Sequence, residues 1–178
     1  MATMDGMTER DVQIVISGMS YTECPRWHLG RLWFADFDTN AIYSATEAGE
    51  DLRTEVEVPA QPSGLGWLPD GRLVFVSMKD RKVMRRESDV SLVVHADVAD
   101  AVTGHPNDMV GDTEGRCWLG SFGVDLVGGA DVETTSLLRR APGGPVPALA
   151  QTLCGRTATP VPTGAGAPRR PTRLCPRR

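Results

Sequence analysis

Short runs of strand-forming residues recur along this chain, separated by tight turns rich in Gly, Pro and Asp. Such runs occupy residues 12–16, 24–27, 32–36, 41–44, 54–58, 64–67, 73–78, 82–86, 91–95, 117–121 and 136–140, and a further one starts at residue 107. None has the period or length of an amphipathic helix. The pattern therefore predicts an all-β protein.

The strands fall into a repeating unit marked by a Gly-Arg pair. The pairs are Gly30-Arg31, Gly71-Arg72 and Gly115-Arg116, with spacings of 41 and 44 residues. A repeat of roughly 40 to 50 residues with several short strands is typical of β-propeller blades. Three hairpins of a β-sandwich that share one turn type are the alternative. A propeller needs about four or more blades to close, and three units of this length reach only to about residue 140.

The composition changes after residue 133. All 23 acidic residues lie at or before Glu133, whereas residues 134–178 contain eight arginines and most of the prolines. From residue 141 onward the pattern of strands stops, and the composition suits neither a core nor a sheet. We therefore expect a disordered N-terminus over 1–11, a partial propeller over 12–140, and a low-complexity tail over 141–178 that is either disordered or the product of an out-of-frame reading.

Targeting and redox signals are weak. No run approaches the roughly 18 apolar residues that a membrane-spanning helix needs, and the acidic start is unlike a signal peptide. The four cysteines lack the paired spacing of a zinc site. These features predict a cytoplasmic protein with reduced thiols and no membrane partner.

Three short motifs make the sequence resemble a known family. They are Glu23-Cys-Pro-Arg-Trp27, Pro69-Asp-Gly-Arg72 and Pro106-Asn-Asp-Met-Val110. In this order and spacing they resemble the gluconolactonase family of six-bladed β-propellers, also called the senescence marker protein or regucalcin-like family, over residues 12 to about 140. The resemblance implies the first three blades of a propeller, followed by an irregular Arg- and Pro-rich tail.

The same resemblance implies a divalent metal on the propeller axis. Glu23 matches a metal ligand of the family, and the oxygen ligands favour Ca²⁺, with Mg²⁺, Mn²⁺ or Zn²⁺ as alternatives. Asn107 matches a residue that contacts the substrate or a water at the metal, and His105 stands where some relatives carry a substrate-binding arginine. Asp108 either supports these residues or serves a salt bridge or a turn. Without the family context, Glu23 reads as a solvated glutamate and Asn107 as a turn residue.

The implied activity is metal-dependent hydrolysis of a sugar-type lactone. We expect it to be impaired, because the family's later ligands, an Asn in Pro-Asn-Gly and an Asp in Asp-Gly, have no match here. The alternative is a non-catalytic propeller fragment that binds a metal or a partner. The arginine-rich tail does not favour nucleic acid as that partner, because it lacks interleaved aromatic residues.

Overall fold

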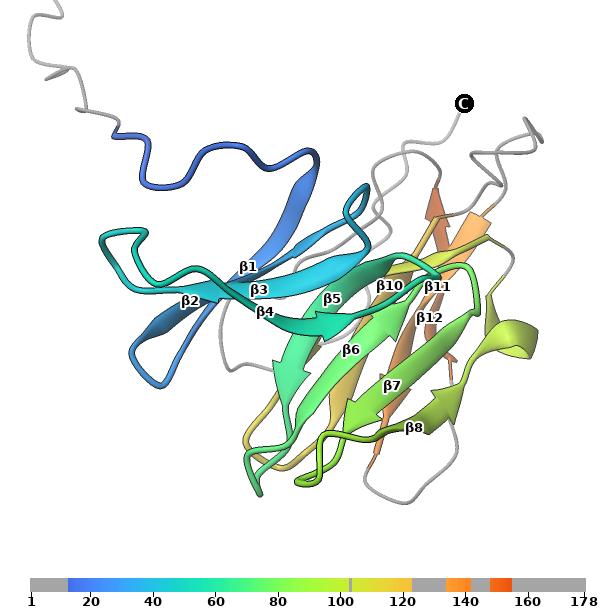
Figure 1. Ribbon diagram of the computed structural model, residues 1–178. Coiled ribbons are helices and arrows are strands. Elements are labelled where there is room, and N and C mark those ends of the chain that lie inside the picture. Colours follow the sequence, from blue (N-terminus) through green and yellow to red (C-terminus); the bar gives the residue numbers. More distant parts are fainter. Residues whose placement is uncertain (1–12, 103, 123–133, 142–147, 155–178) are drawn as a thin grey trace, which may run out of the picture.

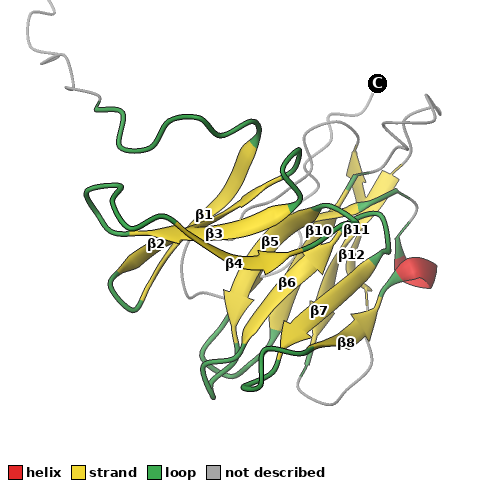
Figure 2. Ribbon diagram, viewed as in Figure 1, coloured by secondary structure: helices red, strands yellow, loops and turns green. Residues whose placement is uncertain are grey.

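The computed structural model describes residues 13–102, 104–122, 134–141 and 148–154, and almost every ordered element in it is a β-strand (Figures 1 and 2). The first sheet contains β1 (Thr22–His28), β2 (Arg31–Asp36), β3 (Ala41–Ala45) and β4 (Arg53–Glu57). The second contains β5 (Pro62–Trp67), β6 (Leu73–Ser77), β7 (Lys82–Arg86) and β8 (Leu92–Asp97). The third contains β9 (Pro106–Gly111), β10 (Cys117–Ser121), β11 (Thr134–Arg140) and β12 (Ala148–Cys154).

Each sheet is a four-stranded antiparallel meander in sequence order. The sheets meet through their first strands, since β5 contacts β1 on one side and β9 on the other (Figure 1). A 3₁₀ turn, Ala99–Ala101, links the second sheet to the third. This is the arrangement of three successive propeller blades with β1, β5 and β9 as inner strands, so the predicted fold class is confirmed.

The Gly-Arg repeat marks the turn between the first two strands of each blade. Gly30, Gly71 and Gly115 adopt left-handed backbone conformations with φ of +76°, +83° and +77°, which glycine adopts without steric cost. The arginine that follows each glycine forms an ion pair with a nearby carboxylate: Arg31 with Asp51, Arg72 with Asp70 and Glu87, and Arg116 with Asp112. A left-handed glycine therefore closes all three hairpins, whereas Arg72 and Arg116 each have an ion-pair partner within the same turn and Arg31 has its partner in the turn between β3 and β4.

Two predictions about the ends of the blades need correction. A propeller boundary at residue 140 is too early, because β12 pairs with β11 and completes the third blade. β12 has only one β-branched residue, Thr152, and no aromatic residue, so the sequence carries little signal for it. The predicted strand at 12–16 is also wrong over its described part, because residues 13–16 form no ladder there. The expectations for 1–11 and 155–178 concern residues outside the described chain.

Apolar side chains fill the spaces between neighbouring blades. One buried cluster lies between the first two sheets and includes Ile42, Leu65 and Phe75; a second lies between the next two and includes Val74, Met109 and Leu138. Because side chains alternate along a strand, the second sheet has two sets of apolar side chains. One set packs against the first sheet and the other against the third. The core is therefore a set of inter-blade layers.

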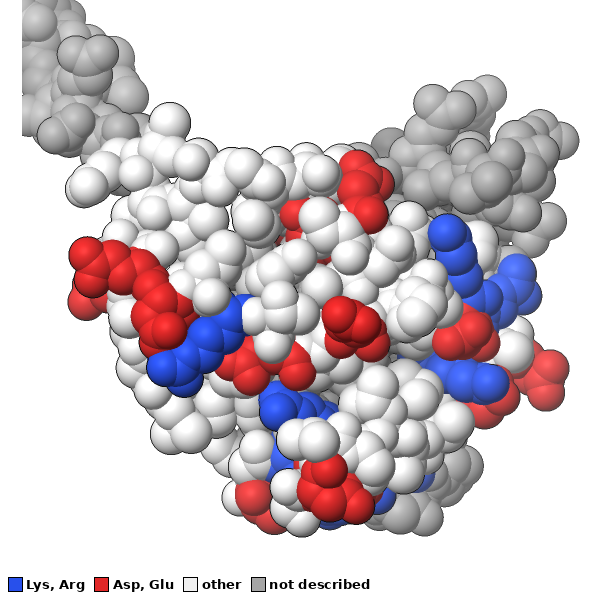
Figure 3. All heavy atoms as spheres, viewed as in Figure 1, with Lys and Arg blue, Asp and Glu red and all other residues white. Residues whose placement is uncertain are grey.

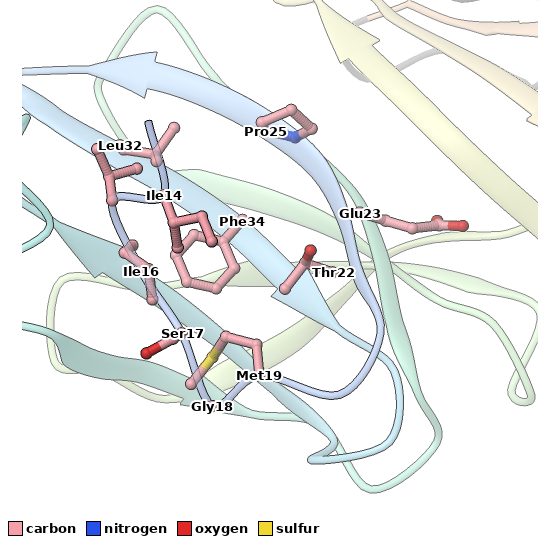
Figure 4. A pocket seen from close by; sticks show the side chains of 11 residues that line it. Ile14, Ile16, Ser17, Gly18, Met19, Thr22, Glu23, Pro25, Leu32 and Phe34 are labelled. Carbon is pink, nitrogen blue, oxygen red and sulfur yellow. The ribbon is translucent and has the colours of Figure 1, made fainter. Parts of the chain in front are cut away.

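The other face of the first blade carries residues 14–19, which line a hollow together with Leu32 and Phe34 (Figure 4). Glu23 borders the same hollow, but its side chain points away from that apolar group (Figure 4). The first blade thus separates an apolar outer face from the polar end of its inner strand.

Charged residues of both signs are interspersed over the face shown in Figure 3. None of the described helices is long and apolar enough to cross a membrane.

Candidate functional site

The three inner strands carry the same irregularity at the same level. A β-bulge interrupts β1 between Glu23 and Arg26, β5 between Pro62 and Leu65, and β9 between Pro106 and Met109. In each blade one residue at the start of the inner strand pairs with the last residue of the second strand: Thr22 with Asp36, Pro62 with Ser77, and Pro106 with Ser121; in the first blade the bulge begins one residue later, after Glu23, which still pairs with Ala35. Glu23, Ser63 and Asn107 follow these residues directly, so they occupy equivalent positions of three blades. A bulge re-aims side chains.

Hydrogen bonds link these three equivalent side chains. The Oγ of Ser63 lies 3.1 Å from Oε2 of Glu23 and 2.8 Å from Oδ1 of Asn107. Ser63 is fully buried and Asn107 is 7% exposed. A hydroxyl carries one proton, so Ser63 donates to one of the two acceptors at a time. Three blades therefore contribute one oxygen-bearing side chain each to a single cluster.

Asp108 ties the first blade to the third at the same level. Its Oδ1 accepts hydrogen bonds from Nη2 of Arg26 at 2.8 Å, from Sγ of Cys24 at 3.2 Å and from the backbone N–H of Met109 at 2.8 Å. Arg26 also donates to the carbonyl oxygen of Met109 at 2.9 Å. These contacts pass over Gly64 of β5, where a Cβ would stand 2.1 Å from the Met109 nitrogen. The absent side chain lets the inner strands converge.

Burial dominates the electrostatics of the cluster. It raises the pKa of Glu23, an effect that the Ser63 hydrogen bond opposes and that the charge of Asp108 reinforces. Burial also raises the pKa of the Cys24 thiol, and the nearby charges of Asp108 and Glu23 add to the rise. Cys24 is therefore a neutral thiol at pH 7 that donates its proton to Asp108, and it is a poor nucleophile. Cys24 and Cys117 are both free and buried.

The donor set suits a hard divalent cation in kind but supplies only part of its shell. Carboxylate, amide and hydroxyl oxygens of Glu23, Asn107 and Ser63 are the ligand types that Ca²⁺ and Mg²⁺ prefer, and Ca²⁺ takes about six to eight of them. Over the described ranges, no three or more His, Cys, Asp and Glu side chains are grouped so as to hold a metal. Oδ1 of Asp108 is already engaged by Arg26. The residues present are therefore suitable as some of the ligands of a cation, and they leave the rest of its coordination shell unfilled.

The structure brings three of the four predicted site residues together. Glu23, Asn107 and Asp108 all belong to the cluster. His105 lies half-buried just before β9, and the hydrogen bonds of this cluster do not include its side chain. Whether Glu23 binds metal, or Asn107 and His105 bind substrate, stays a prediction.

Sequence reasoning missed three members of the cluster: Ser63, Cys24 and Arg26. A signal for Ser63 was present, because it stands eight residues before the glycine of the Gly-Arg pair, as Asn107 does, and Glu23 stands seven before its own. No comparable signal marks Arg26, because its partner Asp108 is 82 residues away in sequence.

The fold and this cluster define a propeller of a recognisable class. The family profile described as the SMP-30/gluconolactonase/LRE-like region matches residues 21–158. The chain therefore belongs to this family. The match also extends beyond residue 140, in agreement with the position of β12.

Solved structures show the same fold at low sequence identity. A gluconolactonase from Xanthomonas campestris is 21% identical with a TM-score of 0.63, over 75% of this chain and 48% of that one. Regucalcin from Agrobacterium tumefaciens, a calcium-binding protein, is 20% identical with a TM-score of 0.54, over 73% of this chain and 44% of that one. A search of curated proteins finds no match. The chain thus spans about half the length of these solved structures.

Proposed function

We propose that this chain is a metal-dependent hydrolase of the gluconolactonase type that acts on sugar-type lactones, with impaired activity. The observation that supports it best is the equivalence of Glu23, Ser63 and Asn107 at the bulges of three successive inner strands. A purely structural propeller has no need for linked oxygen-bearing side chains at one level of its inner strands. The family and the fold point to the same class.

In this proposal Glu23 and neighbouring oxygens hold a divalent cation, Ca²⁺ first among the candidates, which would polarise an ester carbonyl. Asn107 contacts the lactone, and His105 is a further candidate for binding it. Asp108 holds the inner strands in register through Arg26. The described residues offer fewer oxygens than Ca²⁺ takes, so we expect weak metal binding and slow turnover.

The experiment compares the 178-residue chain with Glu23→Gln and with the control Glu50→Gln, which changes an exposed glutamate away from the cluster. Hydrolysis of D-glucono-δ-lactone is followed by pH-stat, above the spontaneous rate, with Ca²⁺ or with EDTA. We expect hydrolysis that requires the metal, is lost in Glu23→Gln and is retained in Glu50→Gln. Activity that persists in EDTA or in Glu23→Gln contradicts the proposal.

A non-catalytic metal- or partner-binding module is the second candidate. It is favoured because the described residues include no group of three or more His, Cys, Asp and Glu side chains that could hold a catalytic metal. Calorimetric titration with Ca²⁺ separates the two, because binding that Glu23→Gln removes, without lactone hydrolysis in the unmodified chain, supports the module and excludes the enzyme.

A further inference from the structure

The amide of Asn107 is held by a single neighbour, Ser63. The hydroxyl oxygen of Ser63 lies 2.8 Å from Oδ1 of Asn107 and 3.1 Å from Oε2 of Glu23. Two acceptor oxygens only 2.8 Å apart need a proton between them, so the hydroxyl proton lies mainly toward Asn107 and only in part toward Glu23, whose contact is the longer. Ser63 is fully buried, so water does not compete for this proton. The amide oxygen of Asn107 is therefore turned toward β5.

This orientation decides what Asn107 offers to a ligand. An amide whose oxygen is engaged presents its two N–H groups as donors. Nδ2 of Asn107 takes part in none of the hydrogen bonds among the described side chains. A lactone offers only acceptors at its ring oxygen and carbonyl oxygen, so the donor face of Asn107 complements it. The flipped amide would instead present Oδ1, which suits a cation.

We infer that Ser63 is a positioning residue that fixes the Asn107 amide as a hydrogen-bond donor to a lactone oxygen. The inference rests on the proposed function for the identity of the ligand. It assigns separate tasks within the cluster: Glu23 faces the cation, Asn107 faces the lactone, and Ser63 sets the orientation that keeps these tasks apart.

The amide signals of the chain make the orientation directly observable by NMR. The chain has two asparagines, Asn40 and Asn107, and three glutamines, so its side-chain NH₂ region is sparse. The Asn107 pair is identified by its loss in Asn107→Asp. Removal of the hydroxyl in Ser63→Ala should shift this pair and the ¹³Cγ signal of Asn107, leave Asn40 unchanged, and be reversed in Ser63→Thr.

Ser77→Ala is the matched control, because Ser77 is a buried serine of the same blade whose hydroxyl bonds Asp80 at 2.8 Å instead of the cluster. It should leave the Asn107 signals in place. Asn107 signals that are unchanged in Ser63→Ala, or that move equally in Ser77→Ala, overturn the inference.

A measurement on the unmodified chain covers the case in which Ser63→Ala does not fold. In mixed H₂O and D₂O, deuteration of the NH₂ group shifts the ¹³Cγ signal of both asparagines, and a hydrogen bond from the Ser63 hydroxyl should add a further isotope shift at Asn107 but not at Asn40, whose Oδ1 has no partner among the described residues. Equal behaviour of the two asparagines overturns the orientation.

The ligand is tested with D-glucono-δ-lactam, which keeps the ring carbonyl and resists hydrolysis. Its addition should shift the Asn107 NH₂ pair in the unmodified chain and less in Ser63→Ala. A shift with Ca²⁺ alone and none with the lactam overturns the donor role. The orientation of the amide is measured without metal or lactone, so it can fail while lactone hydrolysis is observed, and the reverse.

Discussion

The two ends of the inner strands hold the blades together by different chemistry. At the start of β1, β5 and β9, contacts between blades are hydrogen bonds and one ion pair, centred on Ser63 and Asp108. At the other end of β1 and β5 they are aromatic. His28 stacks on Trp67 with ring centroids 3.9 Å apart, and Trp33 meets the edge of Trp67 at 5.4 Å.

The difference lies in how each end responds to substitution. Hydrogen bonds among buried groups depend on the identity of each donor and acceptor, and a lost partner leaves the other unsatisfied. Aromatic packing depends mainly on shape and buried area, so a ring of similar size preserves most of it. We therefore expect the polar end to be sensitive to isosteric changes and the aromatic end to tolerate them.

The largest effect should come from filling the space that lets the polar end converge. Gly64→Ala would place a Cβ 2.1 Å from the backbone nitrogen of Met109, and forcing the strands apart should destabilise the fold by about 3 kcal/mol. Gly71→Ala is the control, since no atom lies within 4 Å of its added Cβ and only its positive φ of +83° is strained; it should cost about 1 kcal/mol. Urea unfolding measures both, and equal costs would contradict convergence through Gly64.

The next effect concerns the ion pair of the polar end. Asp108→Asn keeps the shape but removes the charge that faces Arg26, whose side chain is 19% exposed. It should lower the free energy of unfolding by about 2 kcal/mol, as for hydrogen bonds to charged groups. In the double variant with Arg26→Met, the two losses should be less than additive. Additive losses in denaturant unfolding would show that the two side chains do not act together.

The smallest effect is expected at the aromatic end. His28→Phe keeps an aromatic ring against Trp67 and should change stability at pH 7 by less than about 1 kcal/mol. Its main consequence should be on pH dependence. Burial lowers the pKa of His28 in the folded protein, so the unfolded chain binds more protons near pH 6.

Stability that depends on neutral His28 is complete above the ordinary histidine pKa of about 6.5 and falls as the pH drops through that value toward the lowered folded pKa. Melting temperatures at pH 7 and pH 5.5 should therefore converge in His28→Phe. His95, whose pKa is also lowered by burial and by nearby arginines, keeps part of the dependence. A pH dependence that is identical in the variant would mean that His28 is solvated in the folded state.

Local signals in the sequence were enough to predict most of the fold. Pro69-Asp-Gly71 and the other Gly-Arg turns stand where hairpins close, and the largely apolar run from Leu73 to Ser77 is buried on both faces. The strand β12 was not predictable in this way, because it has a single β-branched residue and no aromatic one, and its evidence in the structure is its pairing with β11. The β-branched run at 12–16 led to the opposite error, because it predicted a strand that the described residues 13–16 do not form. Strand-forming residues need a partner strand to form a ladder.

The site was only partly predictable, for a related reason. Glu23 and Asn107 stand in short motifs that can be read locally. Ser63 matters because it lies between them in space, and Arg26 because Asp108 comes from two blades away. Partnerships across blades depend on bulges and on the close approach at Gly64, which no local pattern encodes.

The three functional groups of this cluster come from equivalent positions of three blades, so their codons lie far apart in the gene. Glu23, Ser63 and Asn107 are separated by 40 and 44 residues, and each belongs to a separate hairpin with its own turn and ladder. A point mutation at one of these positions changes one functional group and leaves the other two hairpins intact. Evolution can therefore explore new ligands one blade at a time, with the propeller scaffold held constant.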